Sequence, residues 1–220
     1  MSDDSLPFAN LDHEREDRWG LPEAVLGIGK TPEQVAEIVL RLKERNRGPI
    51  LVTKTNVEAY EAVRAVLPEA EFHEAAGLMR IWRDPVVAAG TVGVLAAGTA
   101  DIPIAEEAAL TAEAAGAAAD RIYDVGVAGL HRLVSKLERI TTCDALVVVA
   151  GMEGALPTVV GGLTGLPIVA VPTSIGYGTS LNGVAALLGM LNSCAPQVVA
   201  VNIDNGFGAG FFAALVTRKR

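Results

Sequence analysis

The chain has 220 residues, half of them apolar and only 5% aromatic, with a formal net charge of −8. The acidic balance argues against a nucleic-acid-binding protein, for which a basic face is expected. Apolar stretches are interrupted by Gly, Pro and hydroxyl residues before they reach the roughly 20 residues of a membrane span, so none is predicted. Two cysteines and the lack of a signal peptide lead us to expect a reduced, cytoplasmic protein.

The first 85 residues alternate between helical and extended patterns. Residues 1–21 are polar and charged, which favours an exposed first helix. Thr31-Pro32 is typical of a helix start, with Thr as the N-cap and Pro at the first helical position, and this helix is predicted to end near Arg45. The next predicted elements are a strand at 50–54, a helix at 56–66 and one extended stretch at 70–82. Together they predict a small α+β N-terminal domain over residues 1–85, ending at a hinge around Asp84-Pro85.

From Val86 onward, apolar strands alternate with helical segments. The predicted strands cover 91–97, 120–125, 145–150, 167–171 and 197–202. The predicted helices cover 102–116, 127–140, 154–164 and 181–192, with a last one after Gly208. Strands that are apolar throughout and separated by helices indicate a parallel sheet covered on both faces. We therefore predict a doubly wound, flavodoxin- or Rossmann-like α/β domain over residues 86–220, with ligands bound at the carboxyl ends of its strands.

Three of these strand ends carry candidate acid–base or ligand-contact residues. After the first strand, Gly98-Thr99 would let a ligand approach the backbone, and Asp101 lies at the helix start. Simple capping of the helix by Thr99 or Asp101 is an equally good interpretation. After the second strand, His131 lies in an amphipathic helix, where a lone histidine is more often structural than catalytic. After the third, Glu153 lies close to two glycines; if buried, it would have a shifted pKa or a partner, as functional carboxylates often do.

The fifty residues from Gly154 to Ile203 contain no Asp, Glu, Lys, Arg or His. They include a hydroxyl- and glycine-rich loop, VPTSIGYG, whose backbone N–H groups would suit a phosphate. They also include Cys194, in a Ser/Asn/Pro turn that we expect on the same crevice as Glu153. A buried cysteine is normally an inert, small apolar residue, but a lowered pKa would make this one a nucleophile. Cys143, at a strand entrance, is expected at the opposite end of the sheet.

No metal-binding pattern stands out in the sequence. There is no CxxC or HxxxH, and the three histidines are far apart. Asp101, Asp124, Glu153 and Asp204 would be able to share a Mg²⁺ ion with substrate phosphates, since such sites use one or two carboxylates. Whether a metal binds, and to which residues, stays open.

The strand-end segments resemble a known family across nearly the whole chain. GTADIPIAEEA, DVGVAGLHR, AGMEGALPTVVGGL, VPTSIGYG, NSCAP and NIDNGFGA resemble segments of the LarB family of nickel-pincer nucleotide cofactor biosynthesis. The N-terminal LDHERxxRxGxPE and GKTPEQ stretches resemble the same family. Residues 90–217 also resemble, more remotely, the PurE family of purine-pathway carboxylases and mutases. Gln197 departs from the Gly expected after NSCAP, which affects only local turn geometry.

The resemblance to LarB implies a carboxylase that also cleaves a phosphoanhydride. Its substrates would be nicotinic acid adenine dinucleotide and CO₂, and its products pyridinium-3,5-biscarboxylic acid mononucleotide and AMP. Cys194 is implied to add to the pyridinium ring, with Glu153 or Asp101 as proton acceptor and His131 as a helper or phosphate contact. Arg15, Arg18 and Lys54 are candidates to neutralise phosphate charge, with or without Mg²⁺, and to reach across subunits. The other expected substrate contacts are Gly98, Thr99, Gly126, Gly151, Met152, Thr173, Ser174, Gly176, Asn192 and Ser193.

Two other functions remain open. A PurE-type enzyme acting on an aminoimidazole ribonucleotide would need neither the thiol nor the N-terminal domain. A non-enzymatic, oligomeric nucleotide-binding protein would have kept the fold and lost turnover, although the presence of Asp101, Glu153 and Cys194 argues against it. The resemblance to both families also implies a homo-oligomer, a tetramer or octamer built around the uncharged helices, with no tightly bound cofactor.

Overall fold

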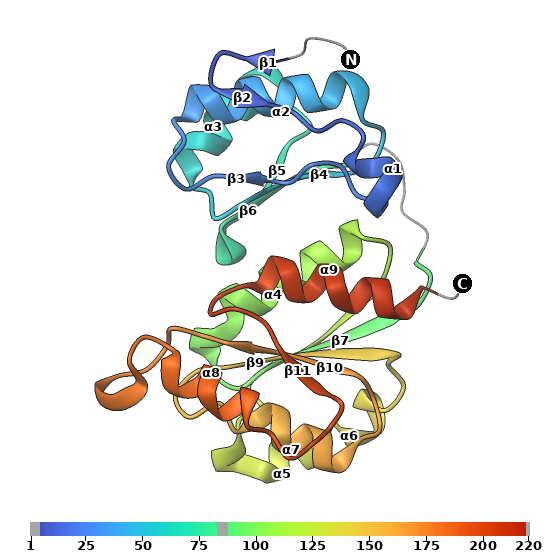
Figure 1. Cartoon of the computed structure of the whole chain (residues 1–220), viewed down its shortest axis with the longest axis vertical. Coiled ribbons are helices and arrows are strands. Elements are labelled where there is room, and N and C mark those ends of the chain that lie inside the picture. Colours follow the sequence, from blue (N-terminus) through green and yellow to red (C-terminus); the bar gives the residue numbers. More distant parts are fainter. Residues whose placement is uncertain (1–4, 83–87, 219–220) are drawn as a thin grey trace. The chain divides into compact units, whose positions relative to one another are not determined.

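The computed structural model describes residues 5–82 and 88–218, and the chain divides into two compact units, Met1–Val86 and Val87–Arg220 (Figure 1). Each unit has its own apolar core. The hinge predicted at Asp84-Pro85 lies outside the described residues.

The C-terminal unit is built on a five-stranded sheet in which every neighbouring pair is parallel. Its strands are β7 (Thr91–Ala96), β8 (Ala118–Ile122), β9 (Ala145–Ala150), β10 (Ile168–Pro172) and β11 (Val198–Ala200). Their spatial order is β11-β10-β9-β7-β8. This is the flavodoxin-like order, in which the chain reverses direction across the sheet between β7 and β9. The predicted doubly wound α/β architecture is confirmed.

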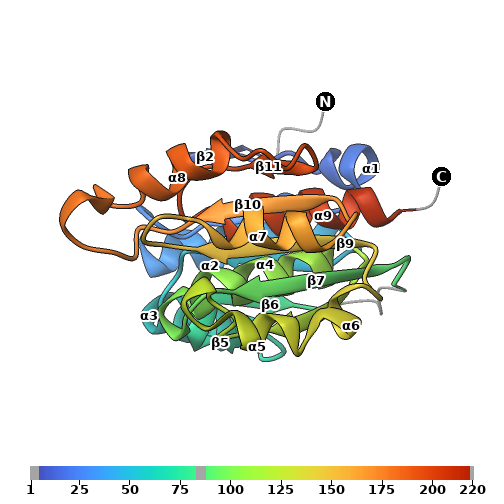
Figure 2. The same ribbon diagram turned by 90° about the horizontal axis from the view of Figure 1, so that it is seen from below.

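Helices cover both faces of this sheet (Figures 1 and 2). One face packs against α4 (Ile102–Ala114) and α9 (Gly206–Thr217), and the other against α5 (Leu130–Val134), α6 (Leu137–Ile140), α7 (Leu156–Leu163) and α8 (Val184–Leu191). Successive strand residues alternate between the two cores, because side chains of a strand point to opposite faces. Val94 packs with α4 and α9, whereas Leu95 packs on the other side.

Small residues let α4 and α9 approach each other closely. Alanines supply most of the buried surface on both helices. A Cβ added at Gly210 of α9 would fall well inside van der Waals contact with the carbonyl oxygen of Ala108 on α4. The Ala- and Gly-rich composition therefore sets the spacing of this helix pair.

The single helix predicted over residues 127–140 is wrong, because this segment is broken into shorter pieces. Residues 127–140 form a 3₁₀ turn (Val127–Gly129) and the two short helices α5 and α6 in place of a single helix. Gly129 leaves the helical region (φ −129°, ψ 64°), and the Ser135 hydroxyl donates to the Arg132 carbonyl at 2.8 Å. Local bonds of this kind compete with a continuous helical ladder.

The N-terminal unit holds a four-stranded sheet of order β3-β4-β6-β5. The strands are β3 (Val25–Leu26), β4 (Ile50–Thr53), β5 (Glu71–His73) and β6 (Leu78–Ile81); β3 and β4 are parallel and the other pairs antiparallel. The helices α2 (Pro32–Arg45) and α3 (Val57–Val66) pack together, and their buried residues share one core with β4 and β6. The short helix α1 (Arg15–Trp19) and the hairpin β1 (Ser5–Leu6) and β2 (Ala9–Asn10) complete the unit.

The start of α2 is as predicted, but the region 70–82 is not one extended stretch. The Thr31 hydroxyl accepts the Gln34 N–H and the Gln34 side chain accepts the Thr31 N–H, which forms a capping box. In the 70–82 region a 3₁₀ turn (Glu74–Ala76) separates β5 from β6, and Gly77 has a positive φ of 53°. Across the described residues, no helix combines the length and apolar character required to span a bilayer.

Candidate active site

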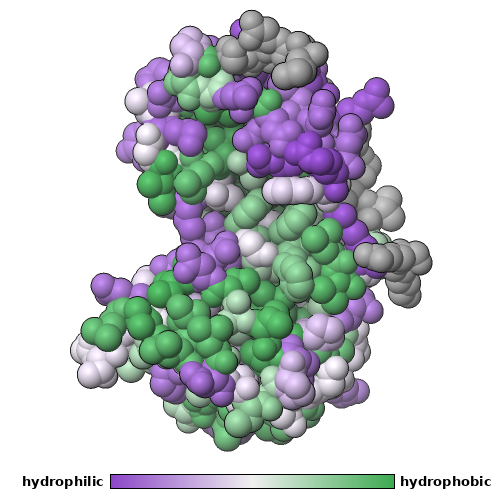
Figure 3. All heavy atoms as spheres, in the orientation of Figure 1, coloured by the Kyte–Doolittle hydropathy of each residue, from purple (hydrophilic) through white to green (hydrophobic). Residues whose placement is uncertain are grey.

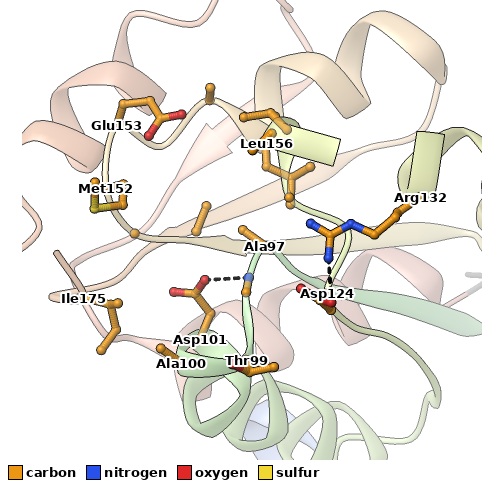
Figure 4. Close-up of a pocket in the computed structure, with 17 residues that line it drawn as sticks. Ala97, Thr99, Ala100, Asp101, Asp124, Arg132, Met152, Glu153, Leu156 and Ile175 are labelled. Carbon is orange, nitrogen blue, oxygen red and sulfur yellow. Dashed lines mark hydrogen bonds and ion pairs between the residues drawn. The ribbon is translucent and has the colours of Figure 1, made fainter. Parts of the chain in front are cut away.

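A cavity of about 390 Å³ opens at the carboxyl ends of β7 and β9, where the strand order reverses (Figure 4). The loops after β7, β8 and β9 supply most of its wall. Its lining residues are Ala97, Gly98, Thr99, Ala100, Asp101, Asp124, Gly126, Val127, Ala128, Arg132, Ala150, Gly151, Met152, Glu153, Ala155, Leu156 and Ile175. The wall is therefore mostly apolar, with three carboxylates and one guanidinium.

Asp101 is the buried carboxylate of this cavity, only 4% exposed. The Thr173 hydroxyl donates to its Oδ1 at 2.7 Å, and the Gly98 N–H donates to its Oδ2 at 3.0 Å. Burial raises the pKa of the Asp101 carboxyl, the hydrogen bonds from Thr173 and from backbone N–H groups oppose that rise, and the negative charge of Asp204 adds to it. Asp101 thus holds the start of the 3₁₀ turn before α4 through the Gly98 N–H, and it also presents a carboxyl with a raised pKa to the cavity.

Glu153 is exposed, so the burial on which its functional interpretation depended in the sequence analysis is absent. It lies in a tight turn in which Met152 and Gly154 both have positive φ, 53° and 68°. A Cβ at Gly154 would come within 2.7 Å of the Ala186 carbonyl oxygen, so only glycine fits there. In Figure 4 Glu153 and Asp101 lie on different sides of the cavity.

Arg132, and not the neighbouring His131, lines the cavity. Its Nη1 lies 2.5 Å from Oδ2 of Asp124, and Figure 4 shows this pair on the side away from Met152 and Ile175. His131 is exposed and lies outside the lining. Consecutive helical residues point about 100° apart, so only one of the two can face the cavity. The sequence identified this helix turn, and of its two neighbouring basic residues Arg132 is the one that lines the cavity.

The loop after β10 contributes Ile175 to the cavity wall. Its three predicted phosphate contacts, Thr173, Ser174 and Gly176, do not line the cavity. Thr173 is fully buried against Asp101. The Ser174 N–H donates to Oδ1 of Asp204 at 2.9 Å, and Gly176, whose φ is 153°, lies outside the lining. Among the predicted contacts, Gly98, Thr99, Gly126, Gly151 and Met152 do line the cavity.

Cys194 is exposed and lies outside the cavity. Within one chain it therefore does not share the cavity that Glu153 lines, contrary to the expectation from the sequence. The preceding Ser193 accepts a hydrogen bond from the Thr158 hydroxyl of α7 at 2.8 Å, and the Asn192 amide donates to the Leu188 carbonyl at 2.8 Å. The first bond places the turn beside α7, and the second closes the end of α8. The second thiol, Cys143, is buried next to β9, and burial together with the charges of Asp120 and Asp144 raises its pKa to about 11.

The three predicted cations of the N-terminal unit are not brought together. Arg15 and Arg18 both pair with Asp12, at 3.2 and 2.5 Å, and Arg15 also stacks over Trp19. They belong to α1, whose Glu16 accepts the Gly48 N–H just before β4 begins. Lys54 follows the other end of β4. A phosphate held by Lys54 would therefore lie at the opposite end of this sheet from the two arginines.

The described residues contain no group of three His, Cys, Asp or Glu side chains arranged to hold a metal ion. Asp101, Asp124 and Glu153 do line one cavity. Binding of Mg²⁺ by one or two of them together with substrate phosphates stays a prediction.

Residues 91–219 match the family described as AIR carboxylase, and this match identifies the chain as a carboxylase-type enzyme. Residues 3–83 match a second family, described as LarB/PurE-like N-terminal domain. The chain therefore belongs to the LarB family, whose architecture joins these two domains. Uncharacterized protein MJ0165 of Methanocaldococcus jannaschii is 42% identical over 219 residues, covering 94% of this chain and 83% of the relative. N5-carboxyaminoimidazole ribonucleotide mutase of the same organism is 35% identical over 95 residues, 41% of this chain and 58% of its own length.

Proposed function

We propose that the protein converts nicotinic acid adenine dinucleotide, CO₂ and water to pyridinium-3,5-biscarboxylic acid mononucleotide and AMP. The observation that supports this reaction most strongly is the joint presence of the LarB-type N-terminal domain and the AIR carboxylase domain in one chain. An aminoimidazole ribonucleotide carboxylase would require only the second domain. The solvent-accessible thiol of Cys194 supplies the nucleophile that the pyridinium substrate needs.

The thiol is required because a pyridinium carbon is electrophilic and does not attack CO₂. Addition of the Cys194 thiolate beside the target carbon forms a C–S bond and makes the ring an enamine, nucleophilic at C5. This carbon attacks CO₂ and forms a C–C bond. A base then removes the C5 proton, and the C–S electron pair leaves with the sulfur, which restores aromaticity. Thiolates suit both steps, since they are good nucleophiles and good leaving groups.

The cavity at β7 and β9 is the proposed site for the pyridinium ring and CO₂. Its alanines, Val127, Leu156 and Ile175 offer an apolar wall that suits CO₂ and excludes water from the intermediate. We assign the proton acceptor to Asp101, because it is the buried carboxyl of the cavity and burial raises its pKa above the ordinary value. Arg132 is the cation available to the substrate's carboxylate or phosphate. Water attack on the phosphoanhydride then releases AMP.

We propose that Cys194 serves the cavity of a second copy of the chain. In its own chain it lies outside the cavity, and the surface around it is unusually apolar. Exposed apolar side chains there include Leu188, Leu191 and Val199, with exposures of 54%, 62% and 50%. Figure 3 shows apolar side chains gathered where Figure 1 draws α8, the helix that carries Leu188 and Leu191. Exposed apolar patches of this kind commonly mark protein–protein contacts, so the protein is proposed to be a homo-oligomer.

The experiment is a mixing test between two inactive variants, Cys194→Ala and Asp101→Asn. Each alone should form no dicarboxylated mononucleotide by mass spectrometry, whereas Cys143→Ala should remain active as the matched thiol control. If Cys194 acts in a neighbouring copy, co-assembly of the two inactive variants restores some sites that hold both native residues. Full carboxylation by Cys194→Ala alone would refute the thiol mechanism. Absence of any recovery in confirmed hetero-oligomers would refute the shared site.

A further inference from the structure

The N-terminal unit contains a second cavity, of about 230 Å³, which the proposed chemistry does not use. It lies where the parallel strands β3 and β4 end and where α2 and α3 begin. Its lining residues are Gly27, Ile28, Gly29, Lys30, Pro32, Lys54, Thr55, Asn56 and Ala59. Ligands of α/β units bind at such strand ends.

The charge of this lining is positive. Lys30 and Lys54 both belong to it, and none of its described lining residues is a carboxylate. The Lys30 ammonium group donates to the Leu26 carbonyl oxygen at 2.9 Å, which holds it beside the end of β3. Two ammonium groups around a small polar cavity favour a multiply charged anion over a neutral ligand.

The backbone is shaped for close approach by a ligand. A Cβ at Gly27 would come within 2.8 Å of the Lys54 carbonyl oxygen and 2.9 Å of Thr55 Cβ, so a side chain there would not fit. Gly29 has a φ of 79° and open space beside it. Both α2, of 14 residues, and α3, of 10 residues, begin at this cavity, and helix N-termini attract anions through their N–H groups and dipole.

Thr55 provides an independent indication of a ligand. Its Oγ1 is buried and makes no hydrogen bond among the described residues, although the residue lines the cavity. Buried hydroxyls in folded proteins are normally hydrogen-bonded, and an exception calls for a specific explanation. Rotation of the Thr55 side chain about χ1 would turn this hydroxyl toward the cavity that the residue lines, where an anion oxygen would accept its hydrogen.

We infer that this cavity binds a phosphate group, held by Lys30, Lys54 and the Thr55 hydroxyl. The identity of its natural ligand rests on the proposed function, which makes the phosphate of the product AMP the expected occupant. The lining residues that define the phosphate site all belong to the N-terminal unit.

The test is a titration of the full-length chain with AMP, with inorganic phosphate and with adenosine, followed by amide NMR shifts at Gly27, Gly29 and Thr55. AMP should shift these amides, and adenosine should not. If inorganic phosphate shifts these amides and AMP does not, the cavity is a phosphate site but AMP is not its ligand. No shift with either phosphate compound would overturn the inference.

Variants separate a specific site from general charge attraction. Lys30→Met and Lys54→Met should each weaken AMP binding at least tenfold, whereas Lys136→Met, at an exposed position of the other unit, should not change it. Thr55→Val should weaken binding several-fold while leaving the melting temperature of the free protein equal or higher, and Thr55→Ser should retain binding. An equal loss in Lys136→Met, or none in Thr55→Val, would contradict the assignment. Because binding needs no turnover, failure of the carboxylation assay would leave this result intact.

Discussion

Replacing Thr173 with Val tests whether the Thr173 hydroxyl stabilises the charged form of the buried Asp101 carboxyl. Thr173 is fully buried and donates to Asp101 at 2.7 Å, and Val has nearly the same shape, so the change removes the hydrogen bond without opening a cavity. A hydrogen bond to a charged group contributes about 1.5–3 kcal/mol. For a chain of this size that loss lowers the melting temperature by roughly 3–12 °C at neutral pH.

The loss should depend on pH, with a sign set by Asp101. Burial raises the pKa of this carboxyl, so the stability that it contributes is present below its ordinary pKa and is lost as pH rises through its folded pKa. Removing the Thr173 hydroxyl, which favours the charged form, raises that pKa further. The destabilisation by Thr173→Val is therefore largest at neutral pH and shrinks in acid, where Asp101 is protonated in both the folded and unfolded chains.

Urea unfolding at neutral and acidic pH measures this effect, with Thr111→Val as the matched control. Thr111 is equally buried, but its hydroxyl donates at 2.7 Å to the neutral Glu107 carbonyl of its own helix. The control should lose only about 0.5–1.5 kcal/mol, with little change with pH. A Thr173→Val loss no larger than that of Thr111→Val, or one that is independent of pH, would refute the reasoning.

Three further predictions concern packing, charge and thiol chemistry. In urea unfolding, Gly210→Ala should destabilise the chain by about 1–3 kcal/mol, because the added methyl meets a backbone oxygen of α4. The control Gly162→Ala should be neutral or stabilising, because the added methyl meets nothing within 4 Å. Arg132→Gln should raise the KM of an anionic substrate about tenfold, or ~1.4 kcal/mol, with less than about 1 kcal/mol change in folding stability because its ion pair is partly exposed; an unchanged KM would remove Arg132 from the site. Iodoacetamide at pH 8 should label Cys194 rapidly and leave Cys143, with its pKa near 11, unlabelled until the chain unfolds; equal labelling of both thiols in the folded chain would contradict the described burial.

The sequence predicted the central sheet well because its signals are local. Except for β8, which contains Asp120 and Arg121, each strand of the C-terminal unit is a mostly apolar run, and the helix start at Thr31-Pro32 follows directly from capping chemistry. The place of Asp101 at the carboxyl end of β7 follows from its position after a strand in a parallel sheet. These inferences require only neighbouring residues and the topology rules.

Burial and facing could not be predicted in the same way. Glu153 and Cys194 lie in or beside a long uncharged run, yet both are exposed, because whether an uncharged segment is buried depends on what packs over it. The path of α8 decides the place of Cys194. A Cβ at Gly189 would lie 2.7 Å from the Glu153 carbonyl oxygen, so α8 packs on the turn between β9 and α7, and the residues after α8 then lie beside α7. Likewise, the orientation of α5 decides that Arg132 faces the cavity and His131 does not.

The central claim is that the chain carboxylates the pyridinium ring of nicotinic acid adenine dinucleotide. The most direct measurement is mass spectrometry of the products after incubation of the purified full-length protein with this dinucleotide, ¹³C-bicarbonate and Mg²⁺. We predict equal amounts of AMP and of a pyridinium mononucleotide carrying one ¹³C-labelled carboxyl group. Absence of both products, with ¹³C incorporated only when an aminoimidazole ribonucleotide is supplied, would contradict the claim.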